Sequence, residues 1–119
     1  MHQESSVPAI SSNNAEHYTW GERCDGWHLV KAANLSVIQE RVPPGAAELR
    51  HYHERAEQFF FILSGLATIE VGGIPHRLGV HEGLHIPAGT VHRLSNDQEQ
   101  DLVFVLISTP PSHGDRVNA

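Results

Sequence analysis

Apolar and polar residues along this chain fall into short runs that alternate or are continuously apolar, and no segment repeats with the period of a helix. Most runs are rich in β-branched and aromatic residues and are bounded by glycine or proline, as strands usually are. The predicted strands are residues 18–20, 27–30, 35–42, 47–53, 57–63, 67–71, 74–78 and 102–107, and a further strand opens at His92. The pattern therefore predicts an all-β domain of about ten short strands.

The run at 57–63 differs from the others because it is apolar at both odd and even positions from Phe59 onward. A strand with two apolar faces has to be covered on both. In a chain of 119 residues, we expect the second cover to be another subunit, so the run predicts a homodimer.

The chain length predicts one domain. Residues 1–14 contain few apolar positions and are expected to form a mobile N-terminal arm. Residues 112–119 are polar again and are expected to form a C-terminal tail. These limits predict a single barrel domain at 15–111.

Two histidines stand one residue apart in the predicted strand at 47–53. Alternate side chains of a strand point to the same face, so His51 and His53 lie about 6.6 Å apart along one face. Two imidazoles in this arrangement can share one metal ion. The alternative is a pair of surface histidines, in a chain that has 10 His.

A second stretch, 83–96, carries Pro87 and Gly89 in a turn and His92 at the start of a new strand. Taken together, the two stretches resemble the paired motifs of the cupin superfamily, over roughly residues 36–108. The positions that match the motifs are Gly45, His51, His53, Gly65, Pro87, Gly89, His92 and Asn96. The chain is thereby identified as a small single-domain cupin.

The resemblance implies a double-stranded β-helix, a jelly-roll-like barrel. It also implies a divalent transition metal held by His51, His53, His92 and one oxygen donor, with positions left open for water or substrate. Imidazole ligands suit Fe, Mn, Ni, Zn and Cu alike. The alternative is a cupin that keeps the shape and uses these side chains to bind a small ligand without metal.

The oxygen donor has two candidates. Counting back six residues from Gly65, the glutamate position of the motif falls on Gln58, whereas the shorter count forward from His53 reaches Glu57. Adjacent residues face opposite sides of a strand, so the register decides between them. The spacing to Gly65 favours Gln58. A neutral amide leaves the metal charge uncompensated, which favours an anionic substrate.

Other positions carry weaker expectations. His81 occupies the position of the glycine that opens the second motif, so the turn there is built differently or relies on Gly83. His85 is expected at the barrel mouth or in solvent. His28, His76 and His81 are expected on the surface. Phe60, Ile62 and Trp27 are candidates to line the cavity.

Charge and cysteine content narrow the function classes. A net charge of -6 without a run of Lys or Arg predicts no nucleic-acid or anionic-membrane partner. The lone Cys24 is expected to be an inert packed thiol. With no apolar stretch of signal or membrane length, the cytoplasm is the expected location.

The resemblance therefore implies a metal-dependent enzyme that acts on a small oxygen-rich metabolite, a carboxylate or an enolate. Cupins run several reactions on one scaffold, so the fold does not select one. The alternatives are a non-catalytic protein that binds a small ligand and an interaction protein that uses its aromatic strand.

Overall fold

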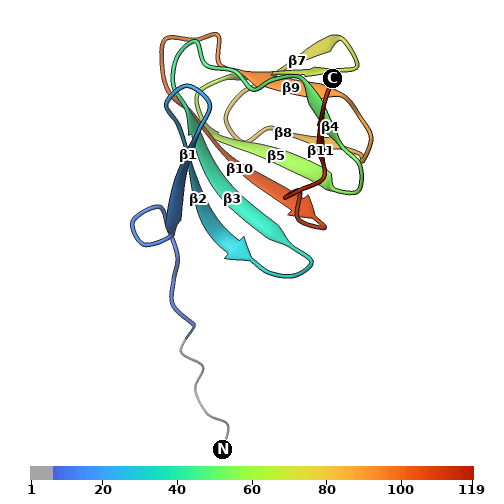
Figure 1. Cartoon of the computed structure of the whole chain (residues 1–119). Coiled ribbons are helices and arrows are strands. Elements are labelled where there is room, and N and C mark those ends of the chain that lie inside the picture. The colour runs from blue at the N-terminus through green and yellow to red at the C-terminus, as the bar shows by residue number, and fades with distance from the viewer. Residues whose placement is uncertain (1–6) are drawn as a thin grey trace, which may run out of the picture.

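A computed structural model describes residues 7–119, which form eleven strands and no helix (Figure 1). The strands are β1 (Glu16–Trp20), β2 (Cys24–Lys31), β3 (Ser36–Val42), β4 (His51–His53), β5 (Glu57–Ser64), β6 (Ala67–Val71), β7 (Ile74–Leu78), β8 (Gly83–Ile86), β9 (His92–Ser95), β10 (Leu102–Thr109) and β11 (Arg116–Asn118). Over these residues nothing has the helical length and apolarity needed to cross a membrane. The all-β prediction is confirmed.

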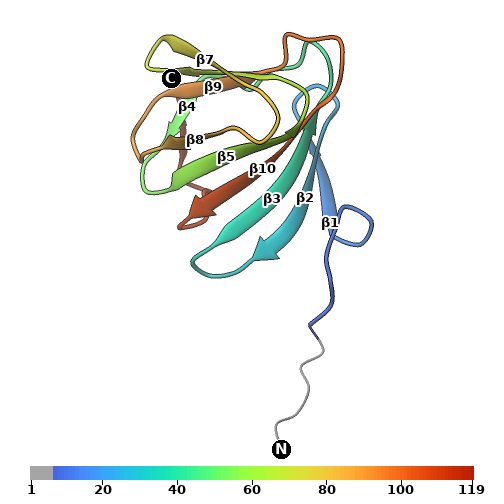
Figure 2. The same cartoon turned by 180° about the vertical axis from the view of Figure 1, so that it is seen from behind.

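The strands form two antiparallel sheets that face each other (Figures 1 and 2). The larger sheet has the order β1-β2-β3-β10-β5-β8, and the smaller has the order β11-β4-β9-β6-β7. Strands distant in sequence therefore become neighbours, as β3 and β10 do. This is the double-stranded β-helix that the motifs predicted.

Alternation along the strands sets which residues face the interior. In β5, the even-numbered Gln58, Phe60 and Ile62 are buried. The pairing of Phe60 with Leu106 and of Ile62 with Phe104 places these side chains in rows on the inner face of the larger sheet. The apolar part of the core is Cys24, Val42, Ala46, Phe60, Ile62, Ala67, Ile69, Leu78, Ile86, Leu94, Leu102 and Phe104.

The outer face of the larger sheet is also apolar. Phe59 and Leu63 are 37% and 38% exposed, and Phe59 stacks on Phe61 with ring centroids 6.2 Å apart. Val105 and Ile107 of β10 pair with Phe61 and Phe59 and are half-buried. The structure thus leaves one aromatic face of β5 partly open, as the two-sided apolar run indicated.

The hairpin of β1 and β2 is tighter than the sequence indicated. The segment 21–26 was expected to be a turn, but Cys24 already pairs with Trp20, and the turn is limited to residues 21–23. Positive φ angles at Gly21 and Arg23 close it. Gly26 consequently lies inside β2, opposite Tyr18.

The last residues of the chain join the barrel. The segment 112–119 was expected to be a polar tail, yet Arg116–Asn118 form β11, which pairs with β4 (Figure 1). β11 is a short strand at the edge of the smaller sheet, and such a strand can be polar because its side chains are largely exposed. At the other end, residues 7–14 precede β1 and are mostly exposed. The division of the chain at 15 and 111 stays a prediction.

The second motif keeps its turn without the expected glycine. His81 itself adopts a left-handed conformation, with φ 65°, which a non-glycine residue takes at a cost in energy. Its ring stacks on Phe61 with centroids 6.0 Å apart, and its backbone N–H donates to the Ile62 carbonyl at 2.8 Å. These contacts hold the turn, so Gly83 does not have to supply the flexibility.

Candidate metal centre and its cavity

A cavity of about 590 Å³ lies inside the barrel. One part of its wall comes from the first histidine motif, and another comes from the inner face of β1, β2 and β3. Its lining includes Tyr18, Trp20, His28, Lys31, Ser36, Ile38, Glu40, Glu48, His51, His53, Gln58, Phe60, Leu106, His113 and Arg116. The volume suits a small molecule.

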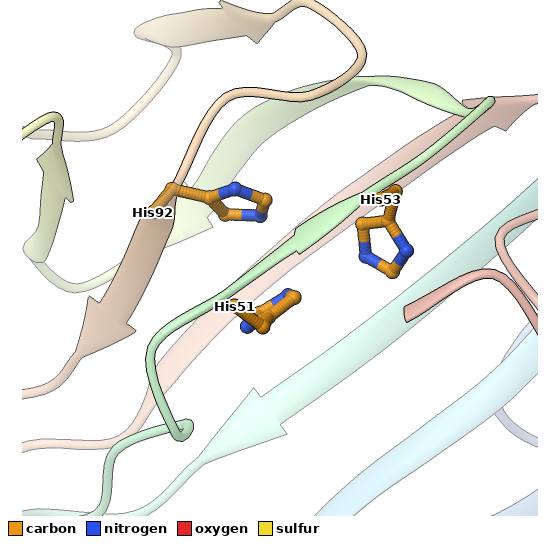
Figure 3. Close-up of side chains that lie close together, drawn as sticks. All are labelled: His51, His53 and His92. Atoms are coloured by element: carbon orange, nitrogen blue, oxygen red, sulfur yellow. The ribbon is translucent and has the colours of Figure 1, made fainter. Parts of the chain in front are cut away.

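Three histidines meet beside this cavity (Figure 3). His51 and His53 point the same way from β4, and the pairing of His51 with His92 brings in the third ring from β9. One ring nitrogen of each residue lies within 4.8 Å of the others. All three residues are buried. The histidines that the two motifs predicted are therefore brought together.

Hydrogen bonds at Nδ1 set which nitrogen each ring presents. The Nδ1 atoms of His51 and His92 lie 2.7 and 2.9 Å from the carbonyl oxygens of Leu49 and Thr90. A carbonyl can only accept, so each Nδ1 carries the proton and donates. Each Nε2 is left with a free lone pair, which is the form of imidazole that binds metal.

Burial keeps His51 and His92 uncharged. Desolvation lowers the pKa of His51 to about 4, with smaller contributions from neighbouring positive charge, although the hydrogen bond to Leu49 opposes the shift. Burial likewise lowers the pKa of His92. Both rings are neutral at neutral pH, so a metal ion does not have to displace a proton from either Nε2.

His53 is oriented by a carboxylate. Its Nδ1 lies 2.7 Å from Oδ1 of Asp115, while Oδ2 of Asp115 accepts the backbone N–H groups of Arg55 and Ala56 at 3.1 and 2.9 Å. Burial alone would raise the pKa of Asp115, but these hydrogen bonds outweigh it and lower the pKa. Asp115 lies in the segment expected to be a tail, so the motifs did not indicate it.

The two candidates for the oxygen donor face opposite ways. Glu57 is 55% exposed and bonds to His85, which is equally exposed, at 2.8 Å. Gln58 is 4% exposed and lines the cavity. Its Nε2 donates to Ser108 Oγ at 3.1 Å. That bond directs the amide oxygen away from Ser108.

Four buried side-chain atoms in or beside the cavity have no hydrogen-bond partner within the described part of the chain: Trp20 Nε1, His28 Nδ1, Gln58 Oε1 and His92 Nε2. Gln58 Oε1 and His92 Nε2 belong to the predicted ligand set. Buried acceptors are rarely left without a partner, and nitrogen and amide oxygen are both ligands of divalent metals. The donor set therefore fits a metal ion, and the three histidines can hold one.

The motifs did not indicate three further groups in the cavity. Glu48 accepts Leu94 N–H at 2.9 Å, and its Oε2 lies 4.0 Å from His51 Nε2. Glu40 accepts a hydrogen bond from the Tyr18 hydroxyl at 2.7 Å. Burial raises the pKa of Glu40 to about 8 and that of Glu48 to about 7. A polar residue at an inward position of a predicted strand is the only sign of Glu40 in the sequence.

Several expectations about the cavity need correction. Trp27 does not line it, because Trp27 lies at an odd position of β2 and packs against His17. Trp20 takes its place. Ile62 is in the core rather than in the wall. His28, expected on the surface, lines the cavity, since it has the same parity in β2 as the buried Cys24 and Gly26.

The cupin domain model matches residues 38–108, which include both histidine motifs and most of the strands described above. The chain belongs to the cupin family. The match covers more than half of the 119 residues. The cupin identification is therefore confirmed.

Three curated relatives are similar to this cupin. Protein SchB of Streptomyces halstedii is 37% identical over 67 residues, which are 55% of this chain and 49% of SchB. Polyketide synthase CurC of Streptomyces cyaneus is 33% identical over 70 residues, 57% of this chain and 46% of CurC. Quercetin 2,3-dioxygenase of Bacillus subtilis is 31% identical over 90 residues, 70% of this chain and 27% of the dioxygenase. The chain spans about half the length of the first two relatives.

Two solved structures share the fold. The polyketide cyclase RemF from Streptomyces resistomycificus has a TM-score of 0.83 at 16% identity, covering 95% of this chain and 85% of RemF. KdgF from Halomonas sp. has a TM-score of 0.80 at 18% identity, covering 87% of this chain and 95% of KdgF. At these identities the likeness concerns the fold.

Proposed function

We propose that this cupin is a metal-dependent enzyme that acts on a small oxygen-rich metabolite, a carboxylate or an enolate. The observation that carries the proposal is the convergence of three buried histidines beside a cavity that Gln58 also lines, with the Gln58 amide oxygen left without a hydrogen-bond partner within residues 7–119. We assign His51, His53, His92 and Gln58 as the metal ligands. A divalent transition metal bound there would act as a Lewis acid toward a substrate oxygen.

The charges of the cavity support an anionic substrate. Arg116 lines the cavity and donates from Nη2 to the Leu49 carbonyl at 3.1 Å. Over residues 7–119 it forms no ion pair with a carboxylate. Its remaining donors are suited to a substrate carboxylate. The neutral Gln58 would leave more of the metal charge for an anionic ligand than a glutamate would.

The names of the similar proteins point in the same direction. CurC is a polyketide synthase and RemF a polyketide cyclase, and poly-β-keto chains are rich in enolisable carbonyl groups. Quercetin 2,3-dioxygenase acts on an oxygen-rich aromatic compound. We therefore favour a substrate with a carbonyl next to an acidic C–H bond.

The second candidate is a cupin that binds such a ligand without converting it. Gln58 favours this reading, because an amide oxygen holds a divalent ion less strongly than a carboxylate does. The two candidates differ in whether a ligand is released unchanged.

The test is elemental analysis of the untagged protein as purified, beside a His51→Ala/His92→Ala variant. We expect about one transition metal per chain in the wild type and none in the variant. His76→Ala/His85→Ala, at two histidines outside the cavity lining and the histidine cluster, is the matched control and should keep the metal. A folded wild type that carries no metal and cannot be loaded at neutral pH would reject the metal-dependent enzyme and favour the ligand-binding protein.

The identity of the oxygen ligand is tested separately. Gln58→Glu should bind divalent metal more tightly, whereas Glu57→Gln should leave the affinity unchanged, because Glu57 points to solvent. Glu48→Gln is the third variant, since Glu48 Oε2 lies close to His51. Calorimetric titration with nickel measures all three, and the reverse pattern at 57 and 58 would show that the assignment of Gln58 is wrong.

We also propose that the cupin is a homodimer, with the outer face of β5 and β10 against a second copy. The aromatic pair Phe59 and Phe61 is the centre of this face, beside Ile107. Light scattering should report twice the 13.2 kDa chain mass. Phe61→Glu should give a monomer, and a wild-type monomer at micromolar concentration would reject the dimer. The cytoplasmic location stays a prediction from the sequence.

A further inference from the structure

The wall of the cavity formed by β1, β2 and β3 carries a hydrogen-bonded pair of polar side chains that are not among the proposed metal ligands. Tyr18, Gly26 and Glu40 occupy one row across these strands, because Tyr18 pairs with Gly26 and Gly26 pairs with Glu40. The Tyr18 ring therefore lies over Gly26, and its hydroxyl reaches Glu40 Oε2 at 2.7 Å.

Gly26 is what allows this arrangement. A Cβ atom at position 26 would overlap the Tyr18 ring, including its hydroxyl oxygen. Glycine weakens the interior of a strand, so its presence there indicates a close approach of another group. The sequence thus keeps an unfavourable residue in β2, and the structure shows that it makes room for the phenol.

Glu40 is buried, with 8% of its surface exposed, and lines the cavity. Over residues 7–119, Tyr18 provides its one side-chain hydrogen bond, and no arginine or lysine forms an ion pair with it. A buried carboxyl group without a cation partner is costly to ionise. It therefore exchanges a proton near neutral pH, which is the property of an acid–base catalyst.

We propose that Glu40 transfers protons to and from a substrate carbon next to a carbonyl, and that Tyr18 and Gly26 position its carboxyl group. The proposal rests on the proposed function, since it places the carbonyl end of the substrate at the histidine cluster. Glu40 would be a catalytic residue, whereas Tyr18 would be a positioning residue.

The step balances without a co-reactant. The Glu40 carboxylate takes the proton as the C–H bond breaks, and an O–H bond forms on Glu40. The electron pair of the C–H bond moves to the carbonyl oxygen, which gives an enolate. When Glu40 returns a proton to the same carbon, the carbonyl re-forms and the carboxylate is regenerated. If the proton on Glu40 has exchanged with solvent in between, the net reaction is exchange of the C–H proton.

The other charged or titratable groups around Glu40 come from four parts of the chain. They are Tyr18 of β1, Cys24 and His28 of β2, Glu48 before β4, and Arg116 of β11. Burial is the largest cause of the raised pKa of Glu40, Glu48 adds to it, and Tyr18 and Arg116 oppose it. Replacing Tyr18 by phenylalanine should therefore raise the pKa of Glu40 further.

The first measurement is made on metal-free protein. Titration of ¹³C-labelled glutamate carboxyl groups by NMR, assigned with Glu40→Gln, should show Glu40 changing near pH 8 and at higher pH in Tyr18→Phe. A midpoint below that of an ordinary exposed glutamate would overturn the proposal. This readout needs neither metal nor substrate.

The second measurement follows exchange of the methyl protons of pyruvate for deuterium with nickel-loaded protein. Glu40→Gln should slow the exchange by about 100-fold and leave nickel affinity unchanged. Glu22→Gln, at an exposed site, is the matched control and should exchange at the wild-type rate. Tyr18→Phe should move the pH profile of exchange upward with the carboxyl titration.

Two outcomes would overturn the assignment while leaving the metal site in place. One is full exchange by Glu40→Gln, and the other is a nickel-loaded wild type that exchanges no pyruvate protons. A wild type that binds no nickel would instead reject the proposed function, and the carboxyl titration would still decide whether Glu40 holds a proton near neutral pH.

Discussion

The cavity has two unlike polar walls. The histidine wall carries His51 and His53 of β4, and His92 of β9 lies beside it through its pairing with His51. Each of the three rings is held by a hydrogen bond at Nδ1. The opposite wall comes from β1, β2 and β3, where a phenol crosses a glycine to reach a carboxyl group. Each wall holds a buried group whose pKa is shifted by desolvation, downward for His51 and upward for Glu40.

The difference lies in how the groups are satisfied. On the histidine wall, neutral Nε2 atoms are left free for an added ligand. On the other wall, Glu40 and Tyr18 satisfy each other. The first arrangement needs a metal ion or another partner to complete it, whereas the second is complete and can hold or release a proton. If the proposed function holds, such a cavity would separate binding of a substrate oxygen from transfer of a proton.

The largest expected effect concerns the support of the histidine wall. In Asp115→Asn, an amide replaces the carboxylate. Its NH2 group cannot accept a hydrogen bond, so the donors on that side lose their acceptor. Either the His53 bond or the bonds to Arg55 and Ala56 are lost. We expect nickel affinity to fall by about 10- to 100-fold and stability by about 1–3 kcal/mol.

Asp97→Asn is the matched control for that change, because Asp97 is exposed and accepts a bond from Thr68. Calorimetric titration with nickel and urea unfolding measure the two effects. If Asp115→Asn binds nickel like the control, Asp115 does not support the metal site. The histidine wall would then not depend on the segment that leads into β11.

A smaller effect is expected at the opposite wall. Gly26→Ala places a Cβ atom against the Tyr18 ring and should cost about 1–3 kcal/mol of the free energy of unfolding. The same change in a Tyr18→Ala background should cost much less, which a double-mutant cycle measures. Gly79→Ala, where a Cβ would meet only the Glu82 side chain at 3.4 Å, is the control. Equal costs in both backgrounds would mean that Gly26 does not serve Tyr18.

A third expected effect is a change in the pH dependence of stability. Glu40 has its pKa raised from 4.5 in the unfolded chain to about 8 in the folded protein. Between these values the folded state keeps a proton that the unfolded state has released, so stability falls as pH rises through this window. Glu40→Gln removes this contribution. The free energy of unfolding of the variant should therefore decline less with pH than that of the wild type.

Urea unfolding of both proteins across that pH window makes the comparison. Because the three clustered histidines are the same in both, their titration cancels in the difference. If the free energy of unfolding depends on pH in the same way in both proteins, Glu40 ionises with an ordinary pKa. Only the histidine wall would then carry groups with a shifted pKa.

Sequence patterns predicted the histidine wall because its information is local. The one-residue spacing of His51 and His53 places them on one face of any strand, and the turn at Pro87 and Gly89 leads directly into His92. The orientation of Gln58 was favoured by spacing, and the structure buries Gln58 and exposes Glu57. No pattern marked Asp115, because it follows a proline-containing loop and comes 62 residues after the histidine it holds.

What the sequence determined by itself was the all-β architecture, the approximate ends of most strands and the residues of the two motifs. Alternation and turn residues act over a few neighbours, so they can be read from the chain. Only the tertiary structure decided which polar residues share the cavity. Tyr18 and Glu40 are 22 residues apart, and the order of β1, β2 and β3 joins them. Their shifted chemistry arises from burial, which is a property of the assembled barrel and of no single segment.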